Sequence, residues 1–173
     1  MFGIYENFPE IYQGIARFSH ATSPKKLQRV LIQSLYKVNR NNDGPNLPEF
    51  AQYNIEVELE LGIADGLTFN YIDKETSRDC QERIRKRAFP TLDFLCIVRY
   101  YAVQKKRRSP LRFDYHMLRF SFSENEVELQ VYHERGTRRL PIDELVNFLT
   151  ERINRGLARK KLSPLEMSHM RAP

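Results

Sequence analysis

The feature that most constrains this chain is an apolar run from Leu92 to Val103, which contains no Gly or Pro. Apolar side chains fall on both faces of a strand drawn through the run, and β-branched and aromatic residues dominate it. Strands with two apolar faces belong inside a sheet that is covered on both sides. The run therefore predicts a central strand, and the rest of the chain is expected to supply its neighbours and its cover.

Three segments show the spacing of amphipathic helices. The first begins at Ser23 and Pro24, which suit the N-cap and the first helical position. The second covers residues 77–88 and is rich in Arg, and the third begins at Pro141. Residues 39–50 are polar and contain every common turn residue, so they predict a loop.

Alternating apolar and polar residues predict a first hairpin from Tyr53–Ile63 to Leu67–Asp73. A three-residue loop ending at Gly66 keeps the apolar faces of both strands together, with Ile63 opposite Leu67. Such a loop requires a left-handed residue at Gly66.

The same pattern predicts a second hairpin from Phe113–Ser123 to Glu126–Glu134. Its register follows from pairing Phe122 with Val127, and it brings His116 opposite His133 on the apolar face. Two cationic imidazoles cannot lie this close in an apolar setting. At least one of them is therefore expected to have a pKa below the usual value of about 6.5.

With a first strand at Gly14–His20, the order of elements is β-α-β-β-α-β-β-β-α. Two hairpins and alternating strands indicate an α+β fold, a mainly antiparallel sheet with helices packed against it. At 173 residues, one domain is expected over residues 1–160. The last residues, 161–173, are basic and polar with few apolar side chains, which predicts a disordered tail.

Composition suggests a reduced compartment and no membrane partner. Only two cysteines are present, Cys80 and Cys96, and they share no short motif. No apolar run reaches the length of about 18 residues that a membrane span needs, and the first residues do not resemble a signal peptide. We expect a cytoplasmic protein.

No motif for catalysis, phosphate binding or metal binding is present. The four histidines lack metal-ligand spacing, and seven Gly are too few for a phosphate loop built from backbone. The sequence thus indicates no cofactor or metal and favours a binding protein over an enzyme. An enzyme acting on an anionic substrate would require a pocket in which Glu56 or Glu58 meets basic residues.

The distribution of positive charge is the sharpest functional signal. The chain carries 28 Lys and Arg against 22 Asp and Glu, a formal net charge of +6. The basic residues gather in four clusters, at 83–87, 105–112, 135–139 and 152–161. Clustered cations attract phosphate backbones, and the neighbouring Tyr100, Tyr101 and Phe113 could stack on bases. The same clusters also occur as ordinary solvated loops and helix faces. The residues expected to contact nucleic acid are Arg85, Arg87, Lys105, Lys106, Arg107, Arg108 and Arg112.

Two binding functions follow. The first is a nucleic-acid-binding module, with RNA as the favoured ligand, that uses the basic loops and helix 77–88. The second is a protein-interaction or assembly subunit, in which the aromatic residues 1–13 or the loop 39–50 dock on a partner or a second copy. Phosphate contacts weaken steeply with salt and apolar docking does not, so salt dependence separates the two.

Overall fold

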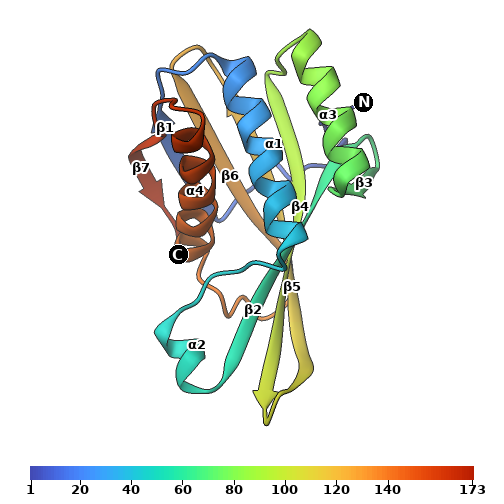
Figure 1. Cartoon of the computed structure of the whole chain (residues 1–173), viewed down its shortest axis with the longest axis vertical. Helices are drawn as coiled ribbons and strands as arrows, with labels where there is room; N and C mark the ends of the chain where they lie inside the picture. The colour runs from blue at the N-terminus through green and yellow to red at the C-terminus, as the bar shows by residue number, and fades with distance from the viewer.

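The computed structural model describes all residues, 1–173, as one seven-stranded antiparallel sheet with helices on one face (Figure 1). The strand order is β3-β2-β4-β5-β6-β1-β7. The strands are β1 Gly14–Ser19, β2 Ile55–Asp65, β3 Thr68–Tyr71, β4 Thr91–Gln104, β5 Arg107–Phe122, β6 Glu126–Arg135 and β7 Glu166–Arg171. The helices are α1 Pro24–Arg40, α2 Pro48–Gln52, α3 Lys74–Lys86 and α4 Ile142–Arg159. The expected α+β fold is confirmed.

The apolar run forms β4, an interior strand, but helices cover only one of its faces. The side chains that face the helices, from Leu92 to Tyr100 in alternation, are at most 2% exposed. On the opposite face Leu95 and Ile97 are only half-buried. The prediction of cover on both faces was therefore only half right, because the second face has no helix layer.

The N-terminal arm, residues 1–13, crosses that second face and is held by a partly buried ion pair. Arg119 donates two hydrogen bonds to the Asp93 carboxylate, at 2.7 and 2.8 Å, and the Tyr5 backbone N–H donates a third at 2.8 Å. The Arg119 guanidinium also lies 4.2 Å from the centroid of the Phe8 ring. Phe8 of the arm thus packs onto the protein's own sheet, while Phe2 packs against Phe89 and Arg83 beside α3.

The register of the first hairpin differs from the prediction. Asp65 pairs with Thr68 and Ala64 with Phe69, so the turn has two residues, Gly66 and Leu67, and the expected pairing of Ile63 with Leu67 was wrong. Phe69 faces the arm, with its ring 4.8 Å from that of Tyr5, because the arm supplies apolar cover on the face that the sequence pattern marks as polar.

Gly66 has φ +70°, so its expected left-handed conformation is confirmed. Gly66→Val should lower the free energy of unfolding by about 1 kcal/mol or more, because a β-branched residue is strained at positive φ. Urea denaturation of the variant measures the loss. Leu67→Ala, an exposed change in the same turn, serves as the control. An unchanged midpoint for Gly66→Val would contradict the assignment.

The second hairpin has the expected register. Phe122 pairs with Val127, and His116 pairs with His133. A register shift between Tyr115 and His116 follows this pair.

The C-terminal residues correct another prediction. Instead of a disordered tail at 161–173, strand β7 pairs antiparallel with β1. Asn154 on α4 holds the approach to this strand by two hydrogen bonds to the backbone of Leu165, at 2.7 and 3.1 Å. Strand β7 is not evident from the sequence pattern because its side chains are mostly exposed and lack apolar alternation, and its backbone pairing with β1 holds it in place.

Candidate nucleic-acid interface

The basic segment 105–112 is a hairpin rather than the expected loop. Lys105 and Lys106 form the turn between β4 and β5, and the hairpin extends beyond the rest of the sheet (Figure 1). Both lysines have positive φ, 48° and 68°. Two-residue turns of this kind usually contain Asn or Gly, because other residues are strained there. The tip therefore keeps two positive charges at a conformational cost of about 1 kcal/mol or more per residue.

Arg108 is neutralised within the hairpin. Its guanidinium lies 2.9 Å from both Glu56 and Glu58, and 4.0 Å from the centroid of the Tyr101 ring. These ion pairs are partly exposed. They bring Glu56 and Glu58 together with a basic residue, as an enzyme acting on an anionic substrate would require. The other hairpin candidates, Lys105, Lys106, Arg107 and Arg112, are exposed and form no ion pair.

The structure separates the α3 candidates from the hairpin candidates. Arg85 pairs with Glu82 at 2.8 Å, and Arg87 lies over the Phe89 ring, both at the end of α3 that leads into β4. The hairpin tip lies at the other end of β4, which at 14 residues spans about 45 Å. The seven residues predicted from the sequence therefore form two separate groups.

Sequence reasoning missed the most basic helix. Helix α1 carries five Lys and Arg and no acidic residue, and it lies in the middle of the helix layer, between α3 and α4 (Figure 1). Its basic residues are Lys25, Lys26, Arg29, Lys37 and Arg40. The absence of any acidic residue was the signal available in the sequence.

Helix packing brings the middle of α1 close to α4. A Cβ at Gly156 would lie 2.8 Å from the Ser34 hydroxyl and 3.0 Å from a methyl of Val30. Gly156 and Ser34 are both small and allow the helices to approach this closely. Lys37, further along α1, consequently lies near enough to Arg159 and Lys160 for their charges to interact.

We call Lys37, Arg40, Arg159 and Lys160 the α1–α4 cluster. Burial, together with the charges of Arg159, Lys160 and Arg40, lowers the pKa of Lys37. No member of the cluster forms an ion pair.

Asp43 lies beside Lys37 and Arg159 but is paired with Arg152, and Glu151, earlier on α4, is likewise paired with other arginines. Arg152 binds Asp43 at 2.6 Å, and Arg155 binds Glu151 at 2.7 Å. The cluster is thus a patch of like charge without a compensating carboxylate.

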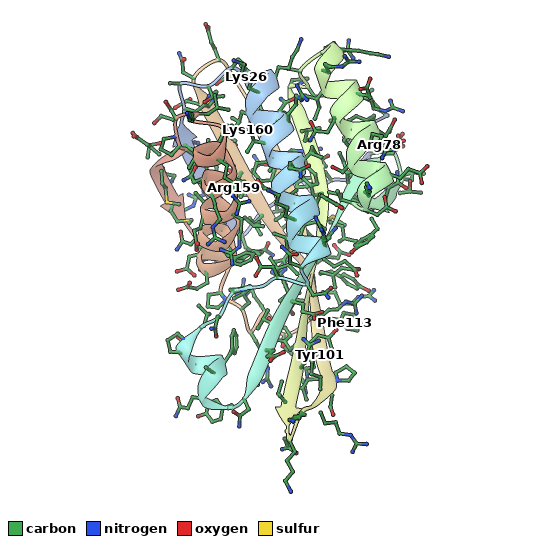
Figure 2. The ribbon with its side chains drawn as sticks, viewed as in Figure 1. Lys26, Arg78, Tyr101, Phe113, Arg159 and Lys160 are labelled. Atoms are coloured by element: carbon green, nitrogen blue, oxygen red, sulfur yellow. The ribbon has the colours of Figure 1, made fainter.

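The aromatic candidates for base stacking lie away from these cations. Figure 2 shows Lys26, Arg78 and Arg159 on the helices, Lys160 directly after α4, and Tyr101 and Phe113 on the β4–β5 hairpin. Tyr101 is covered by Arg108, whereas Phe113 is 45% exposed. Tyr100 is buried, so it cannot stack on a base.

Tyr100 belongs to a buried polar network centred on Asp114. Asp114 accepts hydrogen bonds from the Tyr100 hydroxyl at 2.6 Å and the Arg138 backbone N–H at 2.8 Å, and its carboxylate lies 3.3 Å from His133 Nε2. The Tyr100 hydroxyl accepts in turn from the backbone N–H of Leu140 at 2.7 Å. The network ties the loop before α4 to β4 and β5, which is a structural role.

His116 lies beside this network with neither ring nitrogen hydrogen-bonded. Burial and the charge of His133 lower the pKa of His116 to about 4. The expectation that one histidine of this pair has a lowered pKa is confirmed. The two rings lie 5.0 Å apart between centroids.

Comparison with protein-family models, curated proteins and solved structures finds no match. None of the helices is both long and apolar enough to cross a membrane. No group of three or more His, Cys, Asp or Glu side chains is placed to hold a metal ion.

Proposed function

We propose that the chain is a non-enzymatic nucleic-acid-binding module and that its main contact surface is the basic helix layer, defined as the exposed faces of α1, α3 and α4. The α1–α4 cluster is the observation that carries the proposal. The positive charges of Arg40, Arg159 and Lys160 disfavour the charge of Lys37, and no carboxylate in an ion pair with the cluster offsets this repulsion. A row of phosphates would relieve that repulsion and release counterions.

The N-terminal end of α1 supports the same proposal. Lys25 and Lys26 lie in the first turn of the helix, where the helix dipole favours acidic residues and disfavours cations. Both lysines are exposed, so neither contributes apolar packing to offset this cost. The position suits an anionic ligand better than it suits the isolated helix.

The hairpin tip supplies a second, smaller contact. Lys105, Lys106, Arg107 and Arg112 remain exposed and unpaired there. Because the tip extends beyond the body of the protein, it would touch only an extended polyanion that also lies on the helices. RNA is the first ligand to test.

The test is a charge-matched pair of quadruple variants, measured by fluorescence anisotropy with a labelled RNA at several salt concentrations. Changing Lys37, Arg40, Arg159 and Lys160 together to Gln should lower the affinity at least tenfold. It should also reduce the slope of log K against log salt by about 3, because each lost phosphate contact contributes about 0.7 to 0.9.

The control changes Lys105, Lys106, Arg107 and Arg112 together to Gln, which removes the same charge from the hairpin. Its affinity should fall less than that of the helix variant. A larger loss in the hairpin variant would move the main contact surface to the hairpin. The wild-type chain binding no RNA or DNA at low salt would refute the proposed function.

A protein-interaction or assembly role is the second candidate. The N-terminal arm does not favour it, because the arm packs onto its own sheet. The exposed side chains of Leu111 and Phe113 do favour it, at 49% and 45% exposed on the hairpin. Self-association that resists salt and is lost on Leu111→Ser with Phe113→Ser would support this candidate.

A further inference from the structure

The basic helix layer has few side chains that could bind unpaired bases, and its one accessible aromatic residue, Tyr36 on α1, is half-buried against the core. No large apolar or aromatic side chain on α1, α3 or α4 is exposed. All exposed side chains of this kind lie on the arm, the loops and the strands: Met1, Ile11, Tyr53, Leu67, Tyr71, Leu111, Phe113 and Met167. The layer therefore offers charge and hydrogen-bond donors but no fully exposed aromatic ring on which a base could stack.

This absence distinguishes between two forms of nucleic acid. Proteins that bind single strands combine a basic groove with aromatic side chains, and each stacked base contributes about 1 to 3 kcal/mol. A duplex keeps its bases stacked on one another and presents mainly phosphates to a protein that does not enter its grooves. A surface with cations and no exposed aromatics suits the second form.

The cations of α1 also fall into two groups separated along the helix. Lys26 belongs to the group at the N-terminal end and Lys37 to the group at the other end. They are 11 residues apart, which corresponds to about 17 Å along the axis. The major groove of B-DNA is about 12 Å wide. Long basic side chains at this separation can therefore reach phosphates of both strands that border the groove.

We infer that the ligand of the basic helix layer is a nucleic-acid duplex, bound through the phosphates of both strands. The inference rests on the proposed function and specifies its ligand. It requires contact at both ends of α1, because each group of cations would neutralise one strand.

The experiment compares four labelled probes of 20 nucleotides or base pairs in the same buffer: an RNA duplex, a DNA duplex, oligo(U) and oligo(dT). At least one duplex should bind about tenfold or more tightly than both single strands. The ratio between the two duplexes shows which sugar the protein prefers. Single strands that bind as tightly as either duplex would overturn the inference and leave the proposed function intact, whereas no binding to any probe would refute both.

Three charge-matched double variants test the requirement for two contacts. Lys26→Gln with Arg29→Gln and Lys37→Gln with Arg40→Gln should each reduce duplex affinity several-fold and lower the preference for duplex over single strand. Lys105→Gln with Lys106→Gln, on the hairpin, should leave that preference unchanged. If only one end of α1 affects duplex binding, the two-strand contact is wrong.

Discussion

Gly136→Ala is expected to lower the free energy of unfolding by about 3 kcal/mol or more, through steric clash and backbone strain combined. Gly136 has φ +111°, and a Cβ there would overlap the Asp114 carboxylate and lie 2.7 Å from the Phe113 carbonyl oxygen. The clash is with Asp114 Oδ1, which accepts from the Arg138 backbone N–H and contacts His133 Nε2, while the other oxygen of the same carboxylate accepts from the Tyr100 hydroxyl. Relieving it requires the loop to move, which leaves buried polar groups without partners.

Thermal and urea denaturation measure this loss. Thr137→Ala, an exposed change at the next residue, is the control and should alter stability by less than about 0.5 kcal/mol. Asp114→Ala should cost as much as Gly136→Ala, because it removes the same acceptor. If Gly136→Ala is as stable as the wild type, the loop does not close over Asp114.

Acid should destabilise the fold through His116 before the carboxylates titrate. The pKa of His116 is lowered to about 4 in the folded chain, so the unfolded chain, with a value near 6.5, binds the proton first. The stability that neutral His116 contributes is therefore fully present above pH 6.5, and it is lost as the pH drops towards 4. The slope approaches about 1.4 kcal/mol per pH unit, for a total of about 3 kcal/mol.

The groups that face His116 all belong to the interior or the covering loop. They are Cys96 on β4, His133 on β6, Asp114 on its own strand and Arg138 in the loop. The pKa of Asp114 is lowered, against its burial, by hydrogen bonds from Tyr100, Arg138 and His133. The stability that ionised Asp114 contributes is lost only at pH values below the range from 6.5 to 4 in which His116 acts.

His116→Phe should flatten stability between pH 6.5 and 4, as measured by urea denaturation at several pH values. The ring of Phe fills the same space and needs no hydrogen bonds. His169→Gln, on exposed β7, should leave the profile of the wild type unchanged. An equally steep pH dependence in the Phe variant would show that another group carries it.

The two hairpins show how far the sequence predicts the sheet. The β5–β6 register was predicted correctly because its apolar faces lie against helices that the periodicity also reveals. The β2–β3 register was not, because Phe69 packs against Tyr5, on a segment without regular secondary structure. The residues of a strand indicate which of its faces is apolar. They do not indicate whether an irregular segment elsewhere in the chain covers the other face.

The same limit applies to the candidate site. Runs of cations such as Lys105-Lys106-Arg107-Arg108 are visible in a sequence, but the structure neutralises Arg108 with Glu56 and Glu58. The α1–α4 cluster joins residues more than 100 positions apart in the chain, such as Lys37 and Arg159. Its formation depends on the close helix contact at Gly156, which a charge pattern does not reveal.

The position of β1 in the sheet has a consequence for how the chain folds. Both neighbours of β1, β6 and β7, lie more than 100 residues later in the sequence. Closing loops of that length is slow, and sheets with such distant pairings fold in milliseconds to seconds rather than microseconds. During synthesis, which adds about 5 to 20 residues per second, β1 leaves the ribosome many seconds before either partner exists. Until β6 emerges, both edges of β1 and the side chain of Phe18 remain uncovered, and this stretch is where a chaperone would have most to protect.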